Sequence, residues 1–334
     1  MPPTMLPNTI VDTLGVIAHA DWSLRPAKRK LCVASRTASG WTVEAPCLVH
    51  SVASPHALPD ALQARAGAGR VVFLGLDAAM GLPTAWGQRA GVHDFVDFLT
   101  HTVHQPGWQD FWHPAETPDQ IGLKRPFYPR RPGGTRQHHL VDGLRLHHAH
   151  DLRRQCDHPR PGSPTPCPLF WTLGANQVGK ATLTAWRELV LPALQDPSRT
   201  VSIWPFAGPL AECMHAELTL AEVYPGEVAA WLALDLVARG GKRRQAARKA
   251  QSATLLDTLA SVGAQPTSAL IALIKDGFGE SASGEDAFDA LLGVLGMLLC
   301  VHGRRTVWEP DTPQLVQLEG WVFGRAAPPP AAVD

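Results

Sequence analysis

The chain has 334 residues, 45% hydrophobic and 18% charged, so it can bury the core of one large domain or of a domain with a sizeable insertion. Lys and Arg together number 30, as do Asp and Glu, and the formal net charge is zero. This balance argues against a disordered tail protein and a histone-like polycation, but it leaves room for a local basic surface.

The first part of the chain predicts an antiparallel meander followed by a central strand. Three short strands are expected at residues 15–20, 31–35 and 41–49, joined by short polar connections. A short helix is expected over 58–65, and a nearly continuous apolar strand, VVFLGL, over 71–76. A strand without alternation is typical of the centre of a sheet that is buried on both faces. The predicted order is therefore β-β-β-α-β, with the fourth strand central.

The pattern breaks over residues 106–170, which are rich in Pro, Gly, His and Arg. We expect a long irregular insertion there, with one helix near 140–154. Later helices are predicted over 178–194, 242–262 and 285–301, with another that ends near residue 237. Strands are predicted over 201–206 and 218–223. This divides the chain into a first half of the core (12–105), the insertion (106–170), a second half (171–325) and a disordered tail (326–334).

Several features bear on the cellular location. No apolar run reaches the roughly 18 residues that a membrane helix needs. The N-terminus lacks the basic region and apolar block of a secretory signal. The six cysteines are scattered without a C-x-x-C pair, which favours reduced thiols over a disulfide framework. We therefore expect a cytoplasmic protein with no membrane partner.

Acidic residues stand where soluble chains rarely place them without a reason. Asp21 directly follows the first strand, Asp77 ends the central strand, and Glu222 lies in the apolar run LTLAEVYP. Asp286 and Asp289 lie three residues apart on one face of the last helix. Such a cluster needs a cation, because like charges raise one another's pKa, and Mg²⁺ or Mn²⁺ are the natural partners of carboxylate oxygens. Two such ions would support hydrolysis of a phosphodiester.

Each acid also has an ordinary structural interpretation. Asp286 follows Ser283 by three residues, as in a helix capping box. Asp77 is compatible with a turn, Glu222 with an ion pair to an arginine, and Asp21 with the cap of a turn. The case for a metal centre therefore depends on the whole set.

Six short blocks of sequence suggest a family. They are ADWS (20–23), GLDAAMGLP (75–83), AEVYP (221–225), DGFG (276–279), GEDAFDALLGVLGM (284–297) and LEGWVFG (318–324). Together and in this order they resemble the domain-of-unknown-function family 429, which is described as predicted nucleases with an RNase H-like fold. The resemblance covers nearly the whole chain.

The resemblance implies an RNase H-like mixed sheet flanked by helices, which agrees with the β-β-β-α-β order. It implies that Asp21 and Asp77 are catalytic metal carboxylates, with Glu222 and the two acids of the last helix completing the set. Better-known RNase H enzymes have a Glu on the helix after the third strand, where this sequence offers only Asp60. If Asp60 faces away, Glu222 must take its place.

Basic residues predict two places that bind phosphates. The run GGKRRQAARK either tracks a nucleic-acid backbone or forms the solvated face of a helix. Its basic side chains are Lys242, Arg243, Arg244, Arg248 and Lys249. Lys180, in GANQVGK, opens a helix as in a phosphate loop, but Ala181 replaces the required Ser or Thr. An anion-binding helix N-terminus is the more modest expectation there.

Histidines and cysteines between residues 138 and 167 also suggest zinc. They are His138, His139, His147, His148, His150, Cys156, His158 and Cys167. Their spacing is irregular, so a solvent-exposed insertion rich in Arg and His is favoured over a zinc site.

The sequence thus predicts a Mg²⁺- or Mn²⁺-dependent nuclease on an α/β domain, with nucleic acid as its partner. One alternative is a non-catalytic module of the same fold that binds nucleic acid or protein. A second is a phosphotransferase or ATPase of the actin-like fold, which the Gly-free segment DWSLRPAKRK disfavours. Residues 121–275 have an excess of basic side chains and both ends an excess of acidic ones, so the predicted metal acids lie mostly in the acidic ends and the predicted phosphate-binding residues in the middle.

Overall fold

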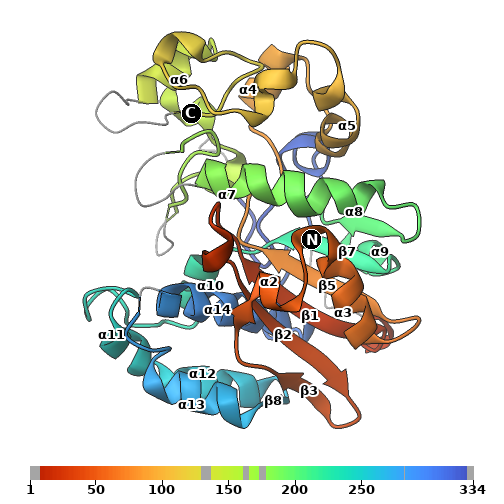
Figure 1. Cartoon of the computed structure of the whole chain (residues 1–334), viewed down its shortest axis with the longest axis vertical. Helices are drawn as coiled ribbons and strands as arrows, with labels where there is room; N and C mark the ends of the chain where they lie inside the picture. The colour runs from red at the N-terminus through yellow and green to blue at the C-terminus, as the bar shows by residue number, and fades with distance from the viewer. Residues whose placement is uncertain (1–7, 129–136, 161–164, 173–177, 282, 329–334) are drawn as a thin grey trace.

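The structure, a computed structural model, describes residues 8–128, 137–160, 165–172, 178–281 and 283–328. A central sheet lies between two groups of helices, and a further group forms the upper part of the view (Figure 1). In the part of the chain just given, no helix has the length and apolar character to cross a membrane.

Eight strands of the described residues form one mixed sheet. Their order is β6-β7-β5-β1-β2-β3-β8, with β4 paired to β2. The strands are β1 (Leu14–Asp21), β2 (Lys30–Thr37), β3 (Gly40–Val43), β4 (Cys47–Leu48), β5 (Val71–Leu76), β6 (Val201–Ile203), β7 (Leu218–Glu222) and β8 (Ala264–Pro266). β1, β2 and β3 form an antiparallel meander, whereas β5 pairs in parallel with both β1 and β7. The carboxyl ends of β1, β5 and β7 therefore share one edge of the sheet.

The helices vary from single turns to one long segment. Over the described residues they are α1 (Asn8–Val11), α2 (Val49–Val52), α3 (Leu58–Ala66), α4 (Thr84–Ala90), α5 (Phe95–Thr100), α6 (Gln137–Gly143), α7 (Val178–Ala185), α8 (Leu191–Gln195), α9 (Leu210–Cys213), α10 (Pro225–Trp231), α11 (Gln245–Lys249), α12 (Ser252–Ser261), α13 (Ser268–Asp276) and α14 (Ser283–Val301). A π-helical turn, Trp186–Val190, joins α7 to α8.

Side chains along the central strands point alternately to the two faces of the sheet, and each face packs into its own hydrophobic core. On β1, Ala18 and Ala20 pack into a core that includes α3, the helical segment from α7 to α8, and the aromatic side chains of residues 95–128. Ile17 packs into the other core, with α10, α12, α13 and α14. α14 lies directly on β1 and β2 and is apolar nearly all round, so the sheet and α10 bury it.

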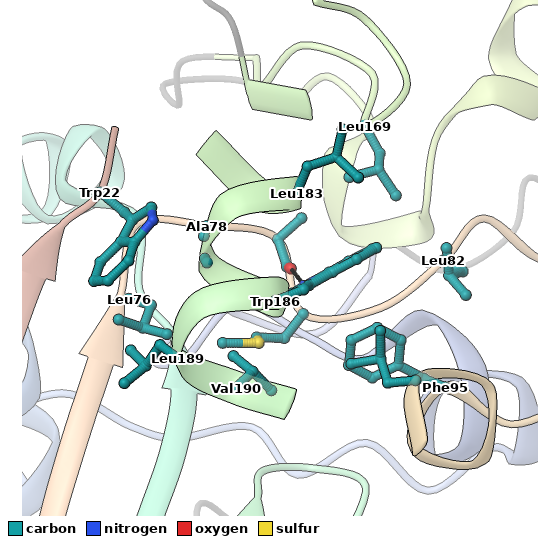
Figure 2. Close-up of a cluster of buried hydrophobic side chains, with 14 of the residues drawn as sticks. Trp22, Leu76, Ala78, Leu82, Phe95, Leu169, Leu183, Trp186, Leu189 and Val190 are labelled. Carbon is teal, nitrogen blue, oxygen red and sulfur yellow. Dashed lines mark hydrogen bonds between the residues drawn. The ribbon is translucent and has the colours of Figure 1, made fainter. Parts of the chain in front are cut away.

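Helix α7 and the π-helical turn fix the loops that follow β1 and β5. Figure 2 shows Leu183 and Trp186 packed between Trp22 on one side and Phe95 on the other. The Trp186 Nε1–H donates to the carbonyl oxygen of Ala79 at 2.8 Å, and the Trp22 Nε1–H donates to Thr184 Oγ1 at 3.1 Å. Asp21 directly precedes the first of these loops and Asp77 begins the second, so this packing helps to set where the two acids lie.

Several predicted elements are confirmed and others are wrong. The strand over 71–76 and the helical segment over 178–194 are confirmed, the latter with an internal π turn. The predicted helix near 140–154 is wrong, because α6 ends at Gly143, Arg145 has a φ of 56°, and two 3-10 turns follow. The predicted helix over 242–262 is two helices, α11 and α12. The predicted strand over 41–49 is likewise two, β3 and β4.

Candidate functional site

Three of the predicted acids come together at the shared edge of the sheet. Asp21 is the last residue of β1, and Asp77 directly follows β5, where its backbone N–H donates to the carbonyl oxygen of Ala20 at 3.1 Å. Helix α14 crosses β1 and brings Asp289 against both strand ends. Asp286 lies one turn earlier on α14 and also acts on the charge of Asp21.

Burial and mutual repulsion make this a cluster that resists ionisation. Burial raises the pKa of Asp21 well above its usual value, and the charges of Asp289, Asp77 and Asp286 raise it further. Burial, followed by the charge of Asp289, raises the pKa of Asp77 to about 7. Burial is also the main cause of the raised pKa values of Asp286 and Asp289. Near neutral pH the cluster must hold protons or a cation.

Two carboxylate oxygens of the cluster lack a hydrogen-bond partner. Asp286 Oδ2 and Asp289 Oδ1 are both buried, and neither has a partner among the described atoms. Ser283 is the first residue of α14, and its Oγ pairs with Ser281 Oγ at 2.7 Å. The capping interpretation of Asp286 therefore leaves one of its buried oxygens unexplained.

Lys242 provides a cation inside the cluster. Its Nζ donates to Asp289 Oδ2 and lies 3.6 Å from Glu285 Oε1. The charge of Lys242 also lowers the pKa values of Asp21 and Asp77, against the larger effect of burial. The sequence predicts Lys242 as a phosphate contact, whereas here it neutralises the acids.

Glu222 ends β7 at the same edge, but both of its oxygens are engaged. Arg154 donates to them at 2.6 and 2.8 Å, and the Met80 N–H donates to Oε2 at 2.7 Å. Arg154 is 1% exposed and also bonds both oxygens of Asp157, each at 2.9 Å. Glu222 thus forms the ion pair with an arginine that its ordinary structural interpretation requires. Its role as a metal ligand stays a prediction, and metal binding would have to replace this ion pair.

The expected exposure of the Arg- and His-rich segment is wrong at its C-terminal end. Arg154, Cys156 and Asp157 are buried beneath the sheet edge. Elsewhere in the segment, the Tyr128 hydroxyl lies 3.1 Å from His139 Nδ1, and the rings of His148 and His150 stack. Zinc ligation by these residues stays a prediction.

The basic run over 240–249 is divided in its roles. Arg248 is wrongly predicted as a phosphate contact, because its guanidinium is 0% exposed and donates to the carbonyl oxygens of Lys242, Gly277 and Gly279 at 2.6 to 2.9 Å. Arg243, Arg244 and Lys249 are exposed, as that prediction requires. Of the whole run, Lys242 alone contributes to the lining of the pocket described next.

A pocket of about 570 Å³ opens above the acids. Asp21, Asp77, Glu222 and Asp286 contribute to its lining. Lys180 and its neighbours on α7, residues 165–167 and 169, and a segment of residues 22–25 with Lys28, here called the rim, also contribute to the lining. Gly174 and the other phosphate-loop-like residues up to 177 lie outside the described residues. Asp60 faces away, since it pairs with Arg199.

The donor set fits a hard divalent cation only in part. Carboxylate oxygens are the ligands that Mg²⁺ and Mn²⁺ prefer, and the two unpartnered oxygens on α14 provide unused acceptors. Across the described ranges, however, no three His, Cys, Asp or Glu side chains are grouped so that they would hold one ion. Entry of a metal would therefore require side-chain rearrangement and release of Lys242 from Asp289.

Comparison with protein-family models, curated proteins and solved structures finds no match to this chain. Among the site features, sequence reasoning missed the cation of Lys242 and the network around Arg154. It also missed Arg25 and Lys28 at the rim of the pocket. The only available signal for the rim was the position of the basic segment RPAKRK, directly after Asp21.

Proposed function

We propose that this protein is a divalent-metal-dependent nuclease of the RNase H-like type, related to the domain-of-unknown-function family 429. The observation that carries the proposal is the convergence of Asp21 and Asp77, which line a pocket, with Asp289, whose charge raises the pKa of both. The strand order β3-β2-β1-β5-β7, with β2 antiparallel, supports the fold. Six free cysteines support a cytoplasmic location.

In this mechanism the chain positions charge around a phosphodiester. Asp21 and Asp77 would hold the cation, with Asp289 and Asp286 as further oxygen donors. The bound cation would supply an activated water and stabilise the leaving oxygen. Lys242 keeps the acids neutralised until the cation arrives, and its ammonium is then available to the substrate. Arg154 and Glu222 hold the loop after β5 in place, because Glu222 and Thr182 accept from the N–H groups of Met80 and Ala79.

The direct test replaces single acids without changing their shape. Asp21→Asn and Asp77→Asn should each lower Mn²⁺-dependent cleavage of an oligonucleotide by at least about 100-fold, the scale of losing a main electrostatic group in a catalytic site. Circular dichroism and the thermal midpoint should stay those of a folded protein. Asp60→Asn is the matched control, since Asp60 is an exposed acid outside the pocket. Full activity in both site variants would remove the proposed mechanism.

A second candidate is a non-catalytic binding module of the same architecture. It is favoured by the ion pairs Lys242–Asp289 and Arg154–Glu222, which satisfy acids that a nuclease would use. Calorimetric titration with Mn²⁺ separates the two. The nuclease requires saturable uptake that Asp21→Asn weakens, whereas the module should take up no Mn²⁺ at this site.

A further inference from the structure

The loop between β1 and β2 presents two cations on a rigid turn. Residues 26–28 form a 3-10 turn in which the Lys28 N–H donates to the Arg25 carbonyl oxygen at 2.9 Å. Arg29 fixes this turn from below: it is buried, its Nε–H donates to the carbonyl oxygen of Ser23 at 2.6 Å, and its Nη1 lies 2.5 Å from Glu188 Oε2. Its guanidinium also lies 4.4 Å from the ring centroid of Trp22.

Arg25 and Lys28 differ from Arg29 in having no internal partner. Both side chains are exposed, and within the described residues neither forms an ion pair or a side-chain hydrogen bond. Both line the pocket whose floor holds Asp21 and Asp77.

We propose that Arg25 and Lys28 form a subsite for the phosphate that neighbours the scissile one, in a single-stranded nucleic acid. This inference rests on the proposed nuclease function and names its substrate class. For one phosphate to bind at the rim while the next phosphate of the strand reaches the acids, the pocket must have a positive region separate from its negative one. Exposed arginine and lysine side chains without partners are the groups that bind phosphates with release of counterions.

The size of the pocket favours a single strand. About 570 Å³ lies within the range of roughly 300–1,000 Å³ for pockets that enclose small ligands, a class that includes a nucleotide. A double helix is wider than its own major groove, which is about 12 Å across, so it cannot enter a pocket of that class as a whole. Val178, Lys180 and Ala181 of α7 and residues 165–167 and 169 line the same pocket as Arg25 and Lys28, so a strand bound there would contact both groups. A single strand enters without the energy needed to extrude a nucleotide from a duplex.

The other basic groups fit this role less well. Arg243 and Arg244 are exposed but do not line the pocket, and Arg243 lies 3.5 Å from Glu285 Oε2. Lys242 lines the pocket but contacts Asp289. The rim pair therefore places positive charge where a phosphate next to the reacting one would lie.

The test measures binding rather than cleavage. In an Asp21→Asn background with Mn²⁺, a labelled single-stranded oligonucleotide is titrated at salt concentrations from about 50 to about 200 mM. Arg25→Gln/Lys28→Gln should flatten the slope of log affinity against log salt by about 0.7, the value for one lost phosphate contact on a single strand. The control Arg187→Gln/Lys275→Gln removes the same charge from exposed residues outside the pocket and should leave the slope unchanged.

The outcomes separate the subsite from the nuclease. An unchanged slope in Arg25→Gln/Lys28→Gln, or an equal flattening in the control, overturns the subsite. It does not overturn the nuclease if the unmodified chain cleaves the oligonucleotide. A flattened slope in a chain that never cleaves supports the subsite and overturns the nuclease. The unmodified chain should also cleave the single strand at least tenfold faster than the same sequence in a duplex. Equal rates overturn the choice of a single strand.

Discussion

Asp77 directly follows a buried strand, and its carboxyl group lies within reach of the charge of Asp289. Its pKa of about 7 in the folded chain compares with about 3.9 for an unperturbed aspartate. The folded state therefore binds the proton that the unfolded state has already lost. Between about pH 4 and about pH 7, this group makes the metal-free protein less stable as pH rises.

The pH dependence follows from this sign. The urea midpoint of Asp77→Asn, measured in a chelator, should exceed that of the unmodified chain by an amount that grows from pH 5 to pH 8. The difference between variants is the right quantity, because His19 acts in the opposite direction. Burial lowers the pKa of His19 to about 4, so this group favours folding as pH rises towards 6.5. A constant offset for Asp77→Asn would contradict its raised pKa.

Lys242 gives a second prediction at this scale. Its ammonium holds Asp289 Oδ2, which a divalent cation must take over. Lys242→Met should therefore raise the affinity for Mn²⁺ by about tenfold or more, since one tenfold step corresponds to only about 1.4 kcal/mol. Arg243→Met, which removes an exposed positive charge nearby, is the calorimetric control and should change the affinity less. Weaker Mn²⁺ binding in Lys242→Met would show that the two cations do not compete.

At the scale of elements, Arg154 attaches the segment after α6 to the end of β7. Arg154→Met leaves Glu222 and Asp157 buried without their partner, a change that typically costs about 3–5 kcal/mol. Urea unfolding should show this loss, and Arg154→Met/Glu222→Gln should recover part of it. Arg153→Met is the control: Arg153 is only half-buried and bonds backbone carbonyl oxygens alone. A loss no larger than that of the control would mean that the network does not hold this segment.

Elements with their own strong pattern could be predicted from the sequence. β5 is a continuous apolar run and α14 a long apolar helix, so each can be recognised in the sequence without knowledge of what packs against it. The break between α11 and α12 falls at Ala250–Gln251, without the Gly or Pro that usually marks such a break. β8 has three residues and exists through its parallel pairing with β3, which no local pattern reveals.

The same distinction applies to the site. Asp21 and Asp77 could be found because each follows a recognisable strand, and topology then brings those strand ends together. The partners of the acids could not be found in this way. Lys242 is 47 positions from Asp289, and Arg154 is 68 positions from Glu222, so these contacts depend on folding of the whole chain. Sequence patterns locate charges on elements, whereas the pairing of charges belongs to tertiary structure.

At the scale of the whole molecule, the sheet edge collects charge from distant parts of the chain. The acidic ends supply Asp21, Asp77, Asp286 and Asp289, and the basic middle supplies Lys242 and Arg154. Charges of opposite sign that cancel over the whole sequence thus also meet at one pocket. The rim cations, Arg25 and Lys28, come instead from the N-terminal part, beside the first acid.

The packing of α14 on β1 has a consequence for synthesis of the protein. Asp21 and Asp77 leave the ribosome before Lys242 and the two acids of α14, which lie more than 160 positions later in the sequence. A nascent chain therefore carries half of the acid cluster, with neither its neutralising cation nor the helix that closes it. For a proposed nuclease that emerges beside messenger and ribosomal RNA, this order of appearance delays cleavage activity until α14 has been made.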